Sequence, residues 1–437
     1  MAGDAGSMCL QVIIEANVKE VFFPANRSRI FEIMKLIYII LFAVAIVFSS
    51  CKDDDPKKTV ELLTVNAVTH TIPYDEVWFV AWDDVGKLLD FKKYVEGETL
   101  TLTTTESIAN DKISVGFLRY RGDDSSTETI TSIYTDLTPG ISFTRDLAGF
   151  GQEPAGSFFL KLTNEPSFGY PNLSGKYGLV ATAGSGENGT TVYECFPTTD
   201  ATKYIVTWVG LPGVYGELND VSAGESFELD ASNLKPFDTE VTINMPSEYN
   251  FMSIFFRGFE SDQAFEEGGY FLDQNNTSIY SPTYKTGYFP GVSKFGLELS
   301  INLDDAYVVY QKYGSLPGTI SWPDPGKYFI NSSDLTSFSV SVTGDPVEYI
   351  AAQWFNTVGT DFHSLYVTSP KLAPKIGEIP ADIVAARPGF ALTTDNLPRS
   401  QVGFILKGSQ SYESEVAEYF SGKTVEQEVM RVTIPGN

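Results

Sequence analysis

Residues 76–102 read EVWFVAWDDVGKLLDFKKYVEGETLTL, and they set the pattern for most of the chain. A run of β-branched and aromatic residues ends at Trp82, a polar turn follows, and a second run alternates threonine with leucine from Thr99. Runs of this kind, interrupted about every 8–12 residues by Gly, Pro, Asn or Asp, are typical of antiparallel β-sandwiches. The sequence therefore predicts an all-β fold.

A second stretch, residues 203–229, has the same layout and reads KYIVTWVGLPGVYGELNDVSAGESFEL. Each stretch has a strand that ends in tryptophan, Trp82 or Trp208, and a Gly-Glu pair further on. A third strand, EYIAAQW, ends at Trp354 but has no Gly-Glu pair at that spacing. A spacing above about 100 residues fits tandem immunoglobulin-like sandwich modules, each with a core tryptophan. Chance similarity between β-rich segments is the alternative.

Two clusters rich in Pro, Gly and Asn indicate the boundaries between the modules. They read TNEPSFGYPNLSG at residues 163–175 and YGSLPGTISWPDPG at 313–326. We therefore expect three sandwich modules at 59–165, 166–314 and 315–437, with two modules as the alternative. One helix is predicted over residues 412–420, YESEVAEYF, because its aromatic and aliphatic residues recur at helical spacing.

The N-terminal part of the chain carries an export pattern, MKLIYIILFAVAIVFSSCKDDD at residues 34–55. A short basic start at Lys35 is followed by an apolar run and then by Ser49, Ser50 and Cys51. This pattern resembles the lipobox of bacterial lipoproteins, in which the cysteine thiol is acylated. The run is shorter than the roughly 20 residues that span a bilayer. The resemblance implies a signal peptide at 34–50 and a lipid anchor on Cys51.

The residues after the cysteine, Lys52, Asp53, Asp54 and Asp55, resemble the export signal of Bacteroidota lipoproteins displayed on the outer face of the outer membrane. On this resemblance, residues 51–58 form an acidic tether and the protein faces the exterior. A signal peptide works from the N-terminus, so residues 1–33 are interpreted as an upstream misread start.

The chain is strongly acidic, with 56 Asp and Glu against 30 Lys and Arg and a net charge of −26. Residues 1–50 hold four side chains of each sign, so their removal leaves the net charge unchanged. Such an anion repels nucleic acid and anionic lipid surfaces. We therefore expect no nucleic-acid partner, and the lipid on Cys51 must hold the protein at the membrane. Glycans and other proteins remain as partners.

The residue types that support common catalytic and metal sites are scarce. Histidine occurs only as His70 and His363, which argues against Ser-His triads and zinc sites. With Cys51 lipidated and Cys9 upstream of the signal peptide, Cys195 is left without a disulfide partner and is expected to be buried and inert. The G-x-G-x-x-G match at 184–189 leads into a strand rather than a helix, so it predicts a hairpin loop. No cofactor and no metal site are predicted.

The only feature that indicates a ligand is an aromatic stretch at residues 268–291, GGYFLDQNNTSIYSPTYKTGYFPG. Tyr280, Tyr284 and Tyr288 lie there among Asn, Ser and Thr, and Trp322 lies between prolines that disfavour a regular central strand. Aromatic faces beside hydroxyls and amides suit stacking of sugar rings and also suit protein partners. The alternative is that these rings pack into the core.

We therefore expect a non-enzymatic lipoprotein of the cell surface that binds a glycan or a protein partner. The layout of a lipid tether followed by β-modules is similar to glycan-binding lipoproteins of polysaccharide-utilisation systems and to fimbrial subunits. A structural or fimbrial role is thus one alternative. A carbohydrate-active hydrolase that uses a carboxylate pair is the other, although no particular pair stands out and acidic pairs such as Asp83-Asp84 are interpreted as solvated turns.

Overall fold

The computed structural model describes residues 58–66, 74–123, 125–145, 155–187, 189–197, 201–303, 306–406, 408 and 410–436. The chain divides into two compact units, 1–58 and 59–437, and the second unit contains nearly all the described residues. About 54% of the described residues are in strands and 9% are helical, so the predicted all-β class is confirmed. The strands form several sheets of different sizes.

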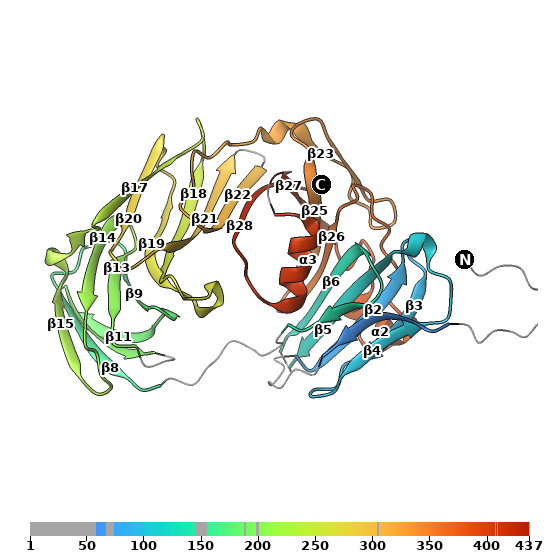
Figure 1. Cartoon of the computed structure of the whole chain (residues 1–437), viewed down its shortest axis with the longest axis horizontal. Coiled ribbons are helices and arrows are strands. Elements are labelled where there is room, and N and C mark those ends of the chain that lie inside the picture. Colours follow the sequence, from blue (N-terminus) through green and yellow to red (C-terminus); the bar gives the residue numbers. More distant parts are fainter. Residues whose placement is uncertain are drawn as a thin grey trace, which may run out of the picture. The chain divides into compact units, whose positions relative to one another are not determined.

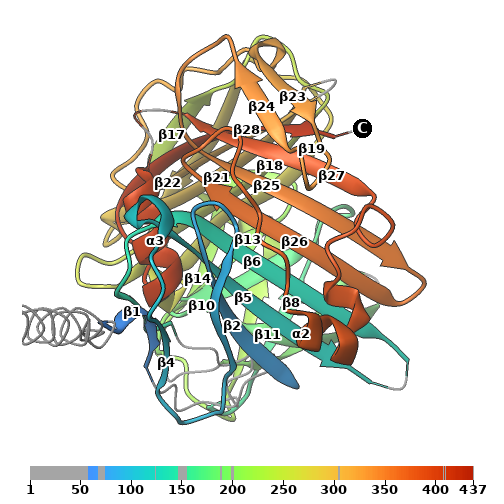
Figure 2. The same ribbon diagram turned by 90° about the vertical axis from the view of Figure 1, so that its right-hand side faces the viewer.

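The largest sheet has twelve strands in the order β19-β18-β21-β22-β28-β27-β25-β26-β6-β5-β2-β3. Figure 2 shows the part from β27 to β2 face on. Neighbouring strands are antiparallel except β26 and β6, which run parallel. The strands are β2 (Glu76–Asp83), β3 (Leu88–Lys93), β5 (Ile113–Gly122), β6 (Thr127–Leu137), β18 (Phe251–Phe259), β19 (Tyr270–Thr277), β21 (Lys294–Leu303), β22 (Ala306–Gly314), β25 (Val347–Val358), β26 (Asp361–Ser369), β27 (Arg399–Leu406) and β28 (Gln427–Pro435).

Both faces of this sheet are covered, which explains the continuous apolar run in β2. Trp78, Val80 and Trp82 belong to one buried cluster, whereas Val77 and Phe79 belong to the cluster on the opposite face. Successive side chains of a strand point to opposite faces, so a strand buried on both sides needs apolar residues at every position.

Smaller sheets and helices cover the two faces. On one face, a three-stranded sheet and helix α3 pack over the cluster that contains Phe79. On the other face, two two-stranded sheets contribute to the cluster that contains Trp82. These elements are β1 (Val60–Val65), β4 (Leu100–Thr104), β7 (Ile141–Phe143), α3 (Tyr412–Ser421), β17 (Thr239–Asn244), β20 (Thr283–Tyr288), β23 (Tyr328–Ser332) and β24 (Ser339–Val342), with α2 (Ala381–Ala386) preceding β27.

Two further sheets form a sandwich of their own around Cys195, Trp208 and Leu160. Their orders are β10-β9-β13-β14-β16 and β11-β12-β8-β15. In Figure 1, the ribbon of this sandwich is coloured in shades of green. The strands are β8 (Phe158–Thr163), β9 (Pro171–Gly175), β10 (Gly178–Leu179), β11 (Ala181–Glu187), β12 (Thr190–Phe196), β13 (Tyr204–Trp208), β14 (Leu211–Leu218), β15 (Ser226–Asp230) and β16 (Lys235–Pro236).

The three tryptophans that end the predicted strands are all buried, with at most 2% of each side chain exposed. Each indole N–H donates a hydrogen bond to a backbone carbonyl outside its own strand: Trp82 to Glu378, Trp208 to Phe168 and Trp354 to Ser333. A buried indole needs such an acceptor. The expectation that these tryptophans lie in the core is therefore confirmed.

The module boundaries 59–165, 166–314 and 315–437 stay predictions. The strand pairing nevertheless links the three predicted modules, which the spacing of the tryptophan-ending strands did not suggest. β22 pairs with β28, and β6 pairs with β26, so segments from all three predicted modules share the twelve-stranded sheet. The strands β25 to β28 lie between the strands of the first and second segments in the sheet order.

Candidate functional site

Helix α3 corresponds to the helix predicted at residues 412–420, and its ends carry standard caps. The hydroxyl of Ser411 accepts a hydrogen bond from the backbone N–H of Ser414, which satisfies one of the free donors of the first turn. Gly422 ends the helix in the left-handed conformation, with φ of 70°. The predicted helix is therefore confirmed, with one more residue at its C-terminal end.

One face of α3 anchors it to the core. Tyr412, Val416 and Phe420 are buried, and they recur at the spacing that places side chains on one side of a helix. The ring of Phe420 lies 5.4 Å from that of Phe143 and 5.6 Å from that of Tyr134, measured between centroids. This anchoring fixes the direction of the remaining side chains of the helix.

A cavity of about 280 Å³ is lined by α3 and by strands β22, β25, β27 and β28, and we call it the α3 cavity. Its volume is close to the lower end of the roughly 300–1,000 Å³ found for small-molecule sites. The lining is mostly polar and combines acids, arginines and amides with a few apolar positions. The main lining residues are Arg145, Gln311, Tyr349, Ala351, Ile405, Gln410, Glu415, Glu418, Tyr419, Gln427, Val429 and Arg431.

Two glutamates of α3 form the acidic side of the cavity. Glu415 accepts hydrogen bonds from the hydroxyls of Tyr134 and Tyr349, each at 3.2 Å. Glu418 accepts a 2.9 Å hydrogen bond from the side-chain amide of Gln410. The pKa of Glu418 is raised above 4.5, first because it is half-buried and second because Glu415 is negative. Both carboxylates thus have neutral donors as neighbours.

An arginine in the middle of a strand forms the basic side. Arg431 lies on β28 opposite Ile405 and Val309 of the flanking strands. Its Nε is buried and has no hydrogen-bond partner among the described atoms. Gly403 makes room for it, because a Cβ at that position would lie 2.7 Å from Cδ of Arg431. The sheet surface therefore accommodates a cationic side chain whose hydrogen-bonding capacity is not fully used.

Gln427, which also lines the cavity, has an unsatisfied acceptor, whereas Arg431 has an unsatisfied donor. Its Oε1 is buried without a donor among the described atoms, whereas its Nε2 donates to Glu418 at 3.4 Å. Buried polar atoms are rarely left unsatisfied, because each costs about 1–3 kcal/mol. One unsatisfied donor and one unsatisfied acceptor therefore belong to residues that line the same cavity.

Arg145 lines the cavity beside the end of α3. Its backbone N–H donates to the carbonyl of Phe420, and its guanidinium lies 5.1 Å from the ring centroid of Tyr419. A guanidinium on an aromatic face keeps its positive charge and its position. Arg145 therefore adds a second cation to the lining.

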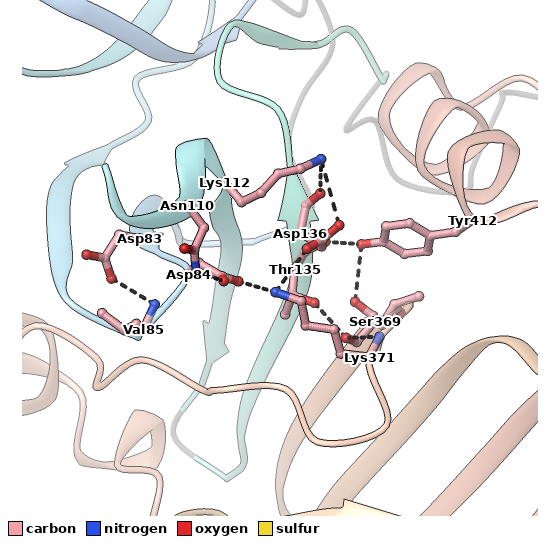
Figure 3. Close-up of polar contacts among 11 residues, drawn as sticks. Asp83, Asp84, Val85, Asn110, Lys112, Thr135, Asp136, Ser369, Lys371 and Tyr412 are labelled. Carbon is pink, nitrogen blue, oxygen red and sulfur yellow. Dashed lines mark hydrogen bonds and ion pairs between the residues drawn. The ribbon is translucent and has the colours of Figure 1, made fainter. Parts of the chain in front are cut away.

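A network of charged residues lies next to the N-terminal end of α3 (Figure 3). Lys371 bridges Asp84 and Asp136, with Nζ 2.9 Å from Oδ1 of Asp136. Asn110 donates to Asp84 at 2.8 Å, and Lys112 lies 3.7 Å from Oδ2 of Asp136. We call these five residues the lysine bridge.

The lysine bridge corrects one sequence interpretation. Asp84 is not a solvated turn residue, because only 12% of its side chain is exposed and it pairs with Lys371. Asp83 is also buried and accepts hydrogen bonds from the backbone of Val85 and Lys87, which shapes the turn after β2. Asp136 sits in a β-bulge at a φ of 59°, a conformation that aspartate tolerates better than most residues.

The opposite flank of α3 borders a larger and more open depression of about 690 Å³. Its lining includes the apolar residues Pro139, Ile141, Val416 and Phe420 and also Lys112. The hydroxyl of Tyr412, which also borders this depression, points into the protein and donates a hydrogen bond to the carbonyl of Thr135. The cations near this depression are already paired in the lysine bridge, in contrast to Arg431.

The structure does not bring the four predicted aromatic residues together as an exposed platform. Tyr280 is 47% exposed, and its ring lies 5.2 Å from that of Tyr249 with the two planes tilted by 55°. Tyr284 is only 8% exposed, so the expectation of an exposed ring is wrong for this residue. Tyr288 and Trp322 are half-buried and pack against the core, and the indole of Trp322 donates to the carbonyl of Asn244 at 3.2 Å.

Three other sequence predictions concern residues that could have been reactive. His363 shares a 2.8 Å hydrogen bond with Thr129. Cys195 is fully buried, and burial raises its pKa to about 12, which agrees with an inert thiol. Residues 184–187 of the dinucleotide match belong to β11, which pairs antiparallel with β12, so no helix follows the glycines and the match is coincidental.

The predicted lipidation site Cys51 and the export residues Lys52, Asp53, Asp54 and Asp55 lie outside the described residues. In the part of the chain that the structure describes, no helix is both long and apolar enough to cross a membrane. Within the same ranges, no group of three His, Cys, Asp or Glu side chains is arranged to hold a metal ion.

Sequence reasoning did not predict the α3 cavity. Arg431 interrupts the apolar run of Val429, Met430 and Val432, and a charge inside such a run was the available signal. Comparison with models of protein families finds no match. A search of curated proteins likewise finds no relative.

Proposed function

We propose that this protein is a non-enzymatic lipoprotein of the outer-membrane surface that binds a small polar ligand in the α3 cavity, such as one residue of a glycan or of a peptide partner. The observation that carries the proposal is the pair of unsatisfied buried atoms, Nε of Arg431 and Oε1 of Gln427. A ligand that hydrogen-bonds both atoms removes a cost that the free protein bears.

The membrane location is supported by the sequence alone. The resemblance of residues 34–55 to a lipobox with an acidic export signal supports a lipid on Cys51 and exposure at the surface. The net charge of −26 favours a soluble body that is held at the membrane by its lipid only.

Glu415 and Glu418 also give the hydrolase alternative a specific pair of carboxylates. The raised pKa of Glu418 is a property that a general acid needs. However, the two residues are three positions apart on α3 and therefore approach the cavity from the same side. Glycosidases place their two carboxylates on either side of the scissile bond. This geometry favours binding over hydrolysis.

Binding can be tested with the mature chain in which Cys51 is replaced by serine to keep it soluble. Thermal shift would be measured with a panel of monosaccharides, oligosaccharides and amino acids, followed by calorimetry of the ligands that raise the melting temperature. We expect at least one ligand whose affinity falls when Arg431 is changed to glutamine. The proposal fails if no ligand in either class binds, or if binding is indifferent to Arg431. Release of a hydrolysis product during incubation supports the enzyme instead.

A further inference from the structure

The α3 cavity has separated charges of opposite sign. Glu415 and Glu418 lie on α3, whereas Arg431 lies on β28 and Arg145 lies beside the end of the helix. Among the described residues, no Arg or Lys nitrogen is within 4.0 Å of either carboxylate, and Arg431 has no carboxylate partner at that distance. Facing charges at a shared cavity ordinarily pair when the side chains can reach each other. Among the described residues, these charges line one cavity without forming an ion pair.

Each class of ligand meets these charges differently. A neutral sugar offers hydroxyls but leaves the charge of Arg431 uncompensated. A simple anion compensates Arg431 and is repelled by the two glutamates, and a simple cation has the reverse problem. A zwitterion satisfies both sides and carries no net charge, so the acidity of the whole protein does not oppose its approach.

We propose that the ligand of the α3 cavity is a free α-amino acid, held by its carboxylate at Arg431 and by its ammonium group at Glu418 and Gln427. This inference rests on the proposed function, because it names the ligand class of the same site. A guanidinium offers its nitrogens as a planar fork that matches a carboxylate. The ammonium group has three donors, and the free Oε1 of Gln427 is one acceptor for them.

The rest of the lining fits the third substituent of an amino acid. Ala351, Ile405 and Val429 supply an apolar surface on the sheet side of the cavity. These residues come from three neighbouring strands, β25, β27 and β28. A small or aliphatic side chain would rest on this surface, which favours amino acids of that kind over aromatic ones in a cavity of about 280 Å³.

The test compares L-leucine with two analogues that each lack one charge. Isoamylamine retains the ammonium group and the carbon skeleton, and 4-methylpentanoate retains the carboxylate. Calorimetry on the soluble Cys51→Ser chain should show binding of leucine, with each analogue weaker by about tenfold or more, since hydrogen bonds to charged groups contribute about 1.5–3 kcal/mol. D-Glucose, D-galactose and N-acetylglucosamine form the sugar arm.

Variants then assign each charge to its residue. Arg431→Gln should weaken leucine by about tenfold or more and should leave isoamylamine unchanged, so that the advantage of the carboxylate disappears. Glu418→Gln should likewise weaken leucine by about tenfold or more and should leave 4-methylpentanoate unchanged, so that the advantage of the ammonium group disappears. Arg399→Gln on the exposed side of β27 and Glu413→Gln on the exposed side of α3 are matched controls that should leave affinity unchanged. Melting curves confirm that each variant is folded.

The outcomes separate this inference from the proposed function. Binding of a sugar that depends on Arg431, without binding of leucine or of other aliphatic amino acids, overturns the amino-acid assignment and supports the proposed function. Binding of amino acids that is unaffected by both Arg431→Gln and Glu418→Gln places them at another site and overturns the inference. No binding in either arm overturns both.

Discussion

The hydroxyl group of Tyr284 donates a 2.9 Å hydrogen bond to Oδ2 of Asp273, and both side chains are buried. Burial raises the pKa of Asp273 to about 6, even though this hydrogen bond favours the ionised form. Tyr284 was one of the residues that the sequence proposed for ligand binding. Its hydroxyl instead supports a carboxyl group inside the core.

The Asp273 carboxyl should make stability fall as the pH rises. Its pKa in the folded chain, about 6, is above the reference value of 3.8, so its protonated form is favoured by folding. The resulting stability is fully present below about pH 3.8 and is lost as the pH rises through 6. A shift of this size corresponds to about 3 kcal/mol. Asp273→Asn should remove most of this dependence, measured by urea unfolding from pH 4 to 8.

Asp238→Asn is the matched control for this experiment. Asp238 also accepts a hydrogen bond from a tyrosine, Tyr215, at 2.8 Å, but it is exposed. The control should keep the pH dependence of the wild type. If Asp273→Asn keeps it as well, the carboxyl of Asp273 is not the group responsible.

Two of the predicted aromatic residues, Tyr284 and Tyr280, should differ in how much their removal destabilises the protein. Tyr284→Ala should lower the free energy of unfolding by about 3–5 kcal/mol, as for other large rings in cores. Tyr280→Ala should have little effect, because its ring is 47% exposed. Urea unfolding of the two variants measures the difference. Equal losses would show that the exposed ring of Tyr280 also supports the core.

The fold class could be predicted because it depends on local sequence. The alternation of residues in strands and the i, i+4, i+8 recurrence of Tyr412, Val416 and Phe420 are read directly along the chain. The role of Tyr284 could not be read in this way. Threonine, lysine and glycine surround it, so its segment resembled a loop, whereas β20 pairs with β17 and turns Tyr284 inward.

The α3 cavity was beyond sequence reasoning for a related physical reason. Arg431 lines the same cavity as Glu415 and Glu418 only because β28 pairs with β22 and β27 and thereby turns one face toward α3. Strand pairing over such sequence separations leaves no periodic trace in either segment. The lysine bridge is similar, because Asp84 and Lys371 are separated by 287 positions in the chain.

The lysine bridge should contribute more to stability than an ordinary surface ion pair. Burial raises the pKa of Asp84, but the hydrogen bonds from Lys371 and Asn110 and the nearby positive charges together outweigh burial and lower the pKa below 3.8. The stability from this group is therefore present above about pH 3.8 and is lost as the pH falls. Lys371→Ala should destabilise the chain at pH 7 by more than the roughly 0–1 kcal/mol of an exposed pair, and by less at pH 3.

Lys327→Ala provides the comparison for the lysine bridge. Lys327 pairs with Asp324 at 3.7 Å, and more than half of each side chain is exposed. Its removal should change the urea midpoint little at either pH. If Lys371→Ala loses no more stability than Lys327→Ala, the lysine bridge does not have the proposed structural role.

Lipidation should depend on one of two cysteines in the exported chain. Acylation requires an accessible thiol at the cleavage site, so Cys51→Ala should abolish incorporation of a palmitate analogue during metabolic labelling. Cys195→Ala should keep the label, because the Cys195 thiol is buried and its pKa is raised to about 12. Label that persists in Cys51→Ala contradicts the lipobox interpretation.

Glu418→Gln should make the protein more stable at neutral pH while it weakens ligand binding. Burial and the charge of Glu415 raise the pKa of Glu418 above 4.5, so folding favours its neutral form, and the stability this gives is lost as the pH rises. Glutamine is neutral at every pH. The melting temperature of the variant should exceed that of the wild type at pH 8, and the two should converge near pH 4.

Glu413→Gln, on the exposed side of the same helix, should show no such gain. A lower melting temperature for Glu418→Gln at pH 8 would mean that the carboxylate is needed for its hydrogen bonds with Gln410 and Gln427, and that its role is structural. Higher stability with weaker binding is the expected result for a charge that is retained for a ligand.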